Sequence, residues 1–586
     1  MQELSDRFAA AVAHFQAGRL AEAEECCRRI LERVPDHPQV LHLLGIVLRQ
    51  AGRHQEAVDW LRRAVARNST QAVYHFDLGA VLMALRRWTE AATAYREVVR
   101  LLPQDPNGWI NLGSALKEQG DYHGALAAYT EVLRLRPEWG MGYYNLGNLH
   151  LWAGHVEEAR ANYERAAALD PESVSAYSNL LFALSYGVLA SPQESLDAHL
   201  EWDNRFGGGE ARRQTFRHAR EDDPHRRLKV GYVSPDFKRH SVSYFFEPLL
   251  RSHDRRRVEV YCYAEVAQAD AVTEHIRREA DHWRSTVGRS DEDVARQIHA
   301  DGIDILVDLA GHTTDSRLRV FTFKPAPVQV SYLGYFSTTG LRSIDYWISD
   351  DTLTPSDTVE RSVEEIWRLP RCCLTYEPPE GVPGVAERPR GVPVVFGSFN
   401  HVLKTSDRAV ALWSRVLRAV PDSRMLLKTG SLDSAAARAD FAARFAAHGI
   451  DAGRLEMRGR TPGVKEHFAA YGEVDIALDT VPRTGGTTTA DALWMGVPVL
   501  SLAGERFIER LSATMLAAIG QDELIATGED DYVQKAVALA QDGARRAILR
   551  ERLRGDMAGS SLCNAAGLAA ALESAYRSMW RRFLDI

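Results

Sequence analysis

The 586-residue sequence predicts an all-helical repeat array followed by two α/β lobes. A period of 34 residues runs through the first third of the chain, and from Lys229 onward short β-branched runs alternate with longer helical stretches. A proline-rich segment at 377–393 divides this second part. Such a length suits three or four domains of about 100–200 residues. We expect repeats at 1–176, capping helices and a linker at 177–227, lobes at 228–390 and 391–565, and a last helix at 566–586.

Small and helix-ending residues recur with the same 34-residue period. Small residues allow two antiparallel helices to cross closely, glycine permits the tight turn between them, and proline ends the second helix because it has no amide donor. The pattern resembles the tetratricopeptide repeat, present about five times. The recurring residues are Gly45, Gly79, Gly113 and Gly147 in one register, Gly18, Gly52, Arg86, Gly120 and Gly154 in a second, and Pro35, Ser69, Pro103, Pro137 and Pro171 in a third.

One polar register of the repeats is a candidate peptide-binding surface. Asn111, Asn145 and Asn179 recur at the same period, with Asp77 in the preceding slot. Such arrays stack into a superhelix with a concave groove. An amide offers both a donor and an acceptor, so a row of them can pair with an extended backbone irrespective of its sequence. We expect these asparagines to bind a partner polypeptide; the alternative is that they only pack between helices.

The composition limits the function classes. The chain has 71 basic and 79 acidic residues and a net charge of −8, which argues against a nucleic-acid partner. No run approaches the ~20 apolar residues of a membrane span, and the N-terminal stretch lacks the pattern of a secretory signal. Six cysteines without a CxxC indicate free thiols in a reducing compartment. We therefore expect a cytoplasmic protein with no membrane partner, and homodimerisation through the repeats is an open possibility.

Two sets of strands are expected in the second part, each in a parallel sheet of a Rossmann-like lobe. Two such lobes facing each other form a cleft at the carboxyl ends of their strands. The expected strands are 228–234, 258–264, 303–310, 328–333 and 346–350 in the first lobe, and 394–399, 424–429, 454–459, 474–480 and 497–504 in the second.

In the first lobe, His240 lies at the turn between a strand that ends at Ser234 and a helix that begins near Ser241. This part of a doubly wound lobe faces the cleft. A histidine there can pass a proton near neutral pH, or bind a sugar or a phosphate. The alternative is a histidine that caps the helix.

In the second lobe, Lys404 follows a strand by five residues and precedes a helical run. An ammonium group at this point would neutralise the charge that develops on a leaving diphosphate. The alternative is an ordinary exposed lysine.

A glycine and threonine run in the same lobe predicts a phosphate site. Glycine admits a phosphate close to the backbone, and the amides of a helix N-terminus and hydroxyl groups then donate to it. Asp491, one turn into the helix, either accepts from a ribose hydroxyl or favours the helix dipole. His467 is placed to cover a base by stacking, with Lys465 near enough to help. The run comprises Gly485, Gly486, Thr487, Thr488 and Thr489.

No acidic cluster has the form of a metal site. Asp350-Asp351 and the acidic run at 529–531 do not form a DxD at a strand end with other ligands nearby. We therefore expect no metal or other cofactor, with charge neutralisation by Lys404 and a helix N-terminus.

Together, the repeats and the motifs VGYVSPDF…HSVSYF, KPAPVQVSYLGY, FGSFN…K and LDT…GGTTT…LWMGVPV resemble the O-GlcNAc transferase/SPINDLY family. The resemblance covers nearly the whole chain. It implies a GT-B fold and an inverting transfer of GlcNAc from UDP-GlcNAc to serine or threonine of proteins held in the repeat groove.

The resemblance also implies roles for single residues. His240 resembles the active-site histidine of the first lobe, and His299, in RQIHADG, a second cleft histidine. Lys404 resembles the essential lysine on the donor diphosphate. The stacking histidine matches His467, and the phosphate and ribose contacts match Thr487, Thr488 and Asp491.

This chain departs from the O-GlcNAc transferases at several of these positions. Gly486 replaces the histidine of their GHTT run, and His401-Val402-Leu403-Lys404 replaces their Gln-Leu-Tyr-Lys. Their lysine three residues before the stacking histidine falls on Val464. Other stretches are closer to the SPINDLY branch, so one alternative is a GDP-fucose protein O-fucosyltransferase. A second alternative is a repeat scaffold whose transferase lobes are inert.

Overall fold

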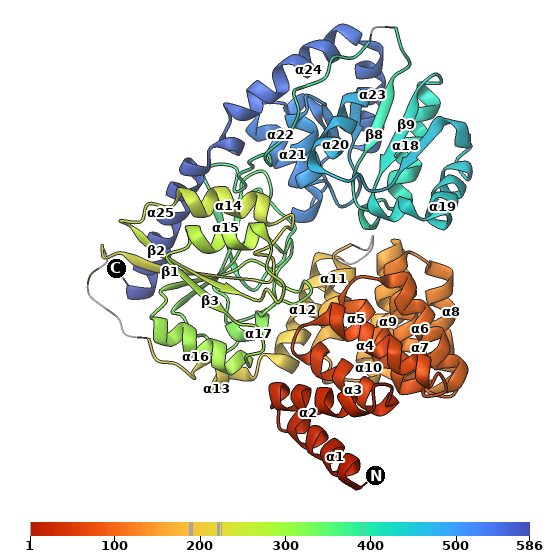
Figure 1. The fold of residues 1–586 in the computed structure, drawn as a ribbon. Coiled ribbons are helices and arrows are strands. Elements are labelled where there is room, and N and C mark those ends of the chain that lie inside the picture. Colours follow the sequence, from red (N-terminus) through yellow and green to blue (C-terminus); the bar gives the residue numbers. More distant parts are fainter. Residues whose placement is uncertain (1, 187–190, 219–222, 224, 390, 586) are drawn as a thin grey trace. The chain divides into compact units, whose positions relative to one another are not determined.

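The structure is a computed structural model that describes residues 2–186, 191–218, 223, 225–389 and 391–585 (Figure 1). These residues form two compact units. The first comprises residues 1–153 and 161–171, and the second comprises 154–160 and 172–586.

The first unit consists of antiparallel helix pairs, as the 34-residue period predicts. In each pair, one helix carries the first glycine register and packs against a second, antiparallel helix. The helices are α1 (Gln2–Gln16), α2 (Leu20–Arg33), α3 (Pro38–Gln50), α4 (His54–Arg67), α5 (Ala72–Ala84), α6 (Trp88–Leu101), α7 (Pro106–Gln119), α8 (Tyr122–Leu135), α9 (Gly140–Ala153) and, from residue 161 onward, α10 (Val156–Leu169).

The recurring glycines have the roles that the sequence predicts. A Cβ at Gly113 would lie 2.5 Å from Tyr129 of the partner helix, and a Cβ at Gly147 would lie 2.5 Å from Tyr163, so only glycine allows these helices to approach so closely. In the turn register, the backbone takes positive φ values at all five positions, including φ 57° at Arg86.

The asparagines of the expected peptide ladder bond to their own helices. The side-chain amide nitrogen of Asn111 donates to the carbonyl of Asn107, and that of Asn145 to the carbonyl of Met141, both at 2.8 Å. Asn179 belongs to the second unit. Asp77, the residue in the preceding slot, is buried, and its carboxylate lies 2.7 Å from Nε2 of His42. Peptide binding by these asparagines stays a prediction.

The second unit opens with α11 (Val174–Leu184), α12 (Pro192–Phe206) and α13 (Gly209–Arg213), where the sequence predicts capping helices. The first of the two lobes contains a seven-stranded parallel sheet in the order β3-β2-β1-β4-β5-β6-β7. Its elements are β1 (Leu228–Ser234), α14 (Ser243–Ser252), β2 (Val258–Ala264), α15 (Ala271–Glu279), β3 (His282–Ser285), α16 (Asp291–Asp301), β4 (Ile305–Asp308), α17 (Leu318–Phe321), β5 (Val328–Ser331), β6 (Tyr346–Asp350) and β7 (Glu365–Leu369).

The second lobe contains a six-stranded parallel sheet in the order β10-β9-β8-β11-β12-β13. Its elements are β8 (Val395–Ser398), the 3₁₀ helix η1 (Val402–Lys404), α18 (Asp407–Ala419), β9 (Arg424–Lys428), α19 (Ala435–Ala446), β10 (Leu455–Arg458), α20 (Val464–Ala469), β11 (Ile476–Leu478), α21 (Thr487–Trp494), β12 (Val499–Leu502), α22 (Leu511–Ala518), β13 (Ile525–Ala526), α23 (Glu529–Gln541) and α24 (Gly543–Ala558).

The expected strands all lie in these sheets, and three further strands have no clear signal in the sequence. Strands β3 and β7 are edge strands with polar or charged residues, and β13 has only two residues. Edge strands bury less apolar surface, so their sequences lack the continuous apolar run that marks a central parallel strand.

The chain passes between the two lobes twice, and the two passages are side by side. After the second lobe, α25 (Ala565–Leu584) returns to the first lobe, where it packs along α14 (Figure 1). The Tyr376 amide, on the outgoing passage, donates to the carbonyl of Leu562, on the returning one, at 2.8 Å. The Glu573 carboxylate of α25 lies 3.1 Å from Nδ1 of His253. The sequence predicts a helix in this last part of the chain.

None of the helices in the described part of the chain combines the length and the apolar character that crossing a membrane requires.

Candidate functional site

A cavity of about 440 Å³ lies in the second unit, at the carboxyl ends of strands from both sheets. Loops after β1, β4 and β5 form one wall, and loops after β8 and β11 form the other. This is the place where open parallel sheets bind ligands. The lining includes Tyr186, Asp236, His240, Thr313, Thr314, Phe336, His401, Leu403, Lys404, Arg483, Gly486, Thr487 and Met515.

The first-lobe wall carries His240 beside a carboxylate. Nδ1 of His240 lies 3.4 Å from Oδ2 of Asp236 and 3.3 Å from the amide nitrogen of Val242. Burial lowers the pKa of His240 and raises that of Asp236, while the attraction between the two groups opposes both shifts. The ring of His240 thus lies beside a carboxylate, and its Nδ1 accepts from the Val242 amide. The sequence does not single out Asp236.

The second-lobe wall carries Lys404 at the end of η1. Its Nζ donates to the backbone carbonyl of Thr484 at 2.8 Å. Burial, and then the positive charge of Arg483, lower the pKa of Lys404 to about 7. Lys404 is thus half-buried and hydrogen-bonded rather than fully exposed. His401, at the start of η1, accepts from the Leu403 amide at 3.3 Å through Nδ1.

The glycine and threonine loop is fixed from behind by a buried carboxylate. Oδ1 of Asp479 accepts from the amide of Gly485 at 2.7 Å and from that of Thr480 at 2.9 Å, and Oδ2 accepts from Ser501 Oγ at 2.7 Å. A Cβ at Gly485 would lie 2.1 Å from Thr489 Oγ1, so this position requires glycine. A Cβ at Gly486 would meet nothing within 4 Å, because that residue faces the open cavity.

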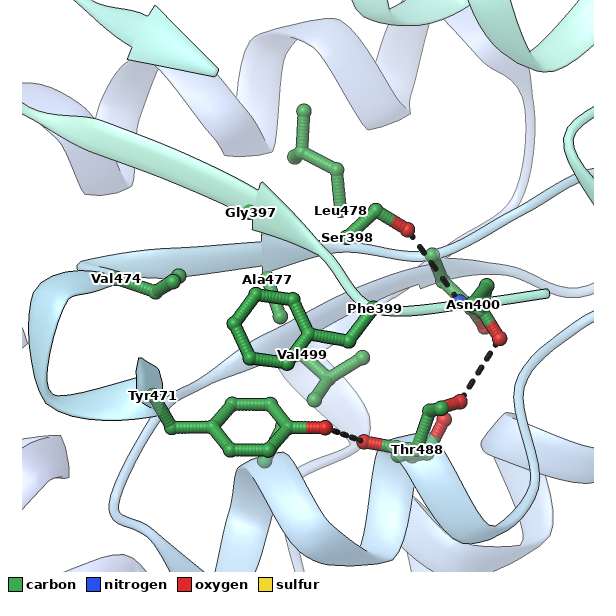
Figure 2. A pocket seen from close by; sticks show the side chains of 13 residues that line it. Gly397, Ser398, Phe399, Asn400, Tyr471, Val474, Ala477, Leu478, Thr488 and Val499 are labelled. Atoms are coloured by element: carbon green, nitrogen blue, oxygen red, sulfur yellow. Dashed lines mark hydrogen bonds between the residues drawn. The ribbon is translucent and has the colours of Figure 1, made fainter. Parts of the chain in front are cut away.

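The three threonines of the loop point in different directions. Thr487 lines the large cavity at the first residue of α21. Thr489 is buried, with its hydroxyl 2.8 Å from that of Ser512, so it supports the loop from inside. Thr488 lines a second, smaller hollow of about 20 Å³ (Figure 2).

Figure 2 shows the hydrogen bonds around this small hollow, which connect the end of β8 to α21. Thr488 Oγ1 donates to Oδ1 of Asn400 at 2.8 Å, and the Asn400 amide nitrogen lies 3.4 Å from Ser398 Oγ. The Tyr471 hydroxyl points to the carbonyl of Thr488 at 3.4 Å, next to the ring of Phe399. The sequence does not indicate Asn400, although it follows a strand end directly.

Asp491 is buried within a polar chain. The Tyr376 hydroxyl donates to Oδ1 of Asp491 at 2.5 Å, and Nε2 of His467 lies 3.8 Å from Oδ2. Nζ of Lys428, at the end of β9, lies 2.7 Å from Nδ1 of His467. This chain orients the His467 ring, and Lys428 rather than the exposed Lys465 is the lysine that contacts it.

The structure does not bring His299 to this cavity. It lies in the last turn of α16, where its ring stacks on Phe216 at a centroid distance of 4.5 Å and faces His218 at 5.6 Å. Its resemblance to a cleft histidine therefore has no support in the geometry.

The arrangement suits a ligand with at least two negative charges. Lys404 and Arg483 face the start of α21, where backbone amides and the Thr487 hydroxyl are donors. On the opposite wall, His240 is able to exchange a proton. Among the described residues, no group of three or more His, Cys, Asp or Glu side chains is arranged to hold a metal ion.

Helical repeats followed by two parallel-sheet lobes, with a cationic cavity between the strand ends of the lobes, define a class of two-lobed ligand-binding proteins that carry a repeat array. The model of glycosyl transferase family 41 matches residues 210–376 and 387–572, and tetratricopeptide repeat models match 7–68, 74–106 and 116–184. The chain belongs to glycosyl transferase family 41.

Named relatives agree with this family. The chain is 38% identical over 417 residues to the probable UDP-N-acetylglucosamine–peptide N-acetylglucosaminyltransferase SPINDLY of Arabidopsis thaliana, which covers 70% of this chain and 45% of the relative. The probable enzyme of the same activity named SEC, also from Arabidopsis thaliana, is 30% identical over 61% of this chain and 37% of its own length. The chain thus spans less than half the length of these curated relatives.

A solved structure extends the likeness to almost the whole chain. A mutant O-GlcNAc transferase of Thermobaculum terrenum has a TM-score of 0.81 and 33% identity, over 88% of this chain and 98% of that one. The expected fold, helical repeats followed by two parallel-sheet lobes, is confirmed.

Proposed function

We propose that this protein is an inverting protein O-glycosyltransferase that transfers GlcNAc from UDP-GlcNAc to serine or threonine side chains. The observation that carries the proposal is the cavity in which Lys404 and the start of α21 lie opposite His240. The names of the SPINDLY and SEC relatives, and that of the Thermobaculum terrenum structure, support the donor and the reaction.

The geometry suggests a role for each residue in the reaction. Lys404, the α21 amides and Thr487 would hold the diphosphate, and His467 would lie against the base. The acceptor hydroxyl oxygen would attack the anomeric carbon from the face opposite the nucleotide. The bond between the anomeric carbon and the diphosphate oxygen would break at the same time, so that the configuration at this carbon inverts. His240, held by Asp236, would accept the hydroxyl proton. Lys404 would stabilise the charge that the diphosphate gains.

Several further properties belong to this proposal. Acceptor proteins would bind in the groove of the repeats, where Asn111, Asn145 and Asn179 recur. The reaction would need no metal ion, because side-chain cations neutralise the leaving group. We also propose a cytoplasmic location, which the six free cysteines support.

Mass spectrometry of a lysate incubated separately with UDP-GlcNAc and GDP-fucose tests the function. We expect new modifications at serine or threonine, each with the mass of one N-acetylhexosamine residue, only with the first donor. A thermal-shift titration gives an independent measure, since UDP should raise the melting temperature more than GDP does. Preferential stabilisation by GDP, together with fucose transfer, would replace our donor assignment.

We expect His240→Ala to lower kcat by about 10²–10⁴-fold, because the hydroxyl proton would lose its acceptor. KM for the donor should change little, since the diphosphate contacts lie on the other wall. Steady-state kinetics with a peptide acceptor measures both constants. Asp236→Asn should reduce kcat less and displace its pH profile. Unchanged kcat in His240→Ala would exclude the histidine as the proton acceptor.

The affinity for UDP should fall as the pH rises above 7. The pKa of Lys404 in the empty site is about 7, so the ammonium is lost above this value unless the diphosphate restores it. Binding therefore takes up a proton at higher pH, and the affinity should fall by up to about tenfold per pH unit. Arg483 and Asp479 are the charged groups that act on Lys404, the first lowering its pKa and the second raising it. Calorimetry at several pH values measures this, and an affinity that rises with pH would contradict it.

A further inference from the structure

Arg483 is a buried cation beside which the described part of the chain places no carboxylate. Only 8% of the residue is exposed, and it lines the large cavity next to Gly486 and Thr487. In the described part of the chain, its Nε has no hydrogen-bond partner, and no carboxylate lies within ion-pair distance of its guanidinium group. A buried charge without a counterion lowers the stability of the fold. Packing alone therefore does not explain an arginine at this position.

The guanidinium group is held in place by rings and not by hydrogen bonds. It lies 3.6 Å from the centroid of the Tyr186 ring and 5.4 Å from that of Phe336. Such stacking orients the plane of the guanidinium group while its N–H donors stay available at the edge. Burial lowers the pKa of Arg483, although an arginine still keeps its charge at neutral pH.

Another buried arginine of the same lobe shows what a structural role looks like. Arg550 is also 8% exposed, and its guanidinium group donates to the carbonyls of Val474 and Ala386. These contacts join α24 to the segment between the lobes and to the loop before β11. Arg483 makes no such contacts with the described residues, so its N–H donors remain available to a ligand of the cavity that it lines.

We propose that Arg483 binds the β-phosphate of the nucleotide-sugar donor, so that it and Lys404 hold the diphosphate together. This inference rests on the proposed function. Lys404 Nζ is bonded to Thr484, the residue directly after Arg483, so both cations lie at the same end of the loop. The α21 N-terminus and Thr487 donate to one phosphate, and a planar guanidinium group is suited to bind two oxygens of the next.

The two cations also influence each other in the empty site. The charge of Arg483 contributes to the low pKa of Lys404, since like charges disfavour each other. A bound diphosphate relieves this repulsion. The arrangement therefore favours a ligand with two phosphates over one with a single phosphate.

Calorimetric titration of the full chain with UDP and with UMP tests the inference. In the wild type we expect UDP to bind more tightly than UMP. Arg483→Gln should weaken UDP binding by roughly ten- to hundredfold, which is the range for a charge-assisted contact. UMP binding should change by less than about threefold. Arg483→Lys should restore part of the UDP affinity, and the pH at which UDP binding weakens should rise in Arg483→Gln.

Arg460→Gln is the matched control, because Arg460 is an exposed cation of the same lobe that does not line the cavity. It should leave the ratio of UDP to UMP affinity unchanged. If Arg483→Gln melts like the wild type and its ratio of UDP to UMP affinity is unaltered, the inference is overturned. That result would be expected if Arg483 bound a carboxylate of the acceptor instead. A wild type that binds neither UDP nor GDP would overturn the proposed function instead.

Discussion

Lys404→Ala is expected to lower sugar transfer by about a thousandfold, as the loss of one preorganised charge at a leaving group does elsewhere. The ammonium group reaches the start of the phosphate loop, where it donates to the Thr484 carbonyl in the empty site. Without it, the charge that develops on the departing diphosphate faces one cation fewer in a partly buried cavity. Transfer of radiolabelled sugar to a peptide, at saturating donor, measures the loss in kcat.

The same variant separates catalysis from acceptor binding. The repeats belong to the other unit, so fluorescence anisotropy with a labelled acceptor peptide should give the same Kd as in the wild type. Lys535→Ala, on α23, is the control for the loss of a lysine from this lobe. If the wild type and Lys404→Ala are equally inactive toward every lysate protein and both donors, the chain is a scaffold with inert lobes.

Asp479→Ala should destabilise the second unit by roughly 3–5 kcal/mol and abolish UDP binding. The carboxylate is 1% exposed and accepts from Gly485, Thr480 and Ser501, so its removal leaves three buried donors without a partner. The first of these donors fixes the loop that carries Arg483 and Gly486. Urea unfolding gives the loss in free energy, and calorimetry gives the loss in affinity.

Asp479→Asn is the informative partner of this variant. The asparagine keeps one acceptor oxygen for the loop amides, but an amide nitrogen, which is a donor, replaces the oxygen that accepts from Ser501. If the side-chain amide flips, the nitrogen faces the loop amides instead. We expect an intermediate loss of stability and measurable UDP binding. Equal stability of the wild type and Asp479→Ala would show that the loop is held by other contacts, such as the Thr489–Ser512 pair.

The sequence predicts those site residues that follow strands. His240, Lys404 and Thr487 come from three loops at the carboxyl ends of parallel strands, and such ends meet at one edge of each sheet. The repeat registers are predictable for a similar reason, because each glycine has one geometric role. The two confirmed features, repeats and paired lobes, are thus those that depend on periodicity and strand order.

Residues whose role depends on side-chain direction are not predictable in this way. Arg483 and Asn400 are single polar residues without a periodic signal, and only the packing of Tyr186 and Thr488 against them reveals their orientation. The contact between Lys428 and His467 could not be predicted. Spacing along a helix indicates Lys465, but it does not show which neighbouring strand end approaches the histidine. His299 is on a helix whose last turn packs on Phe216, which a local motif cannot show.

The paired passage of the chain between the lobes, where the Tyr376 amide bonds to the Leu562 carbonyl, also has a mechanical consequence. Two covalent connections that run next to each other act as one pivot. They let the lobes tilt about a single hinge, while they resist sliding or separation. A ligand of the cavity can then enter and leave by a small rocking motion of one wall against the other.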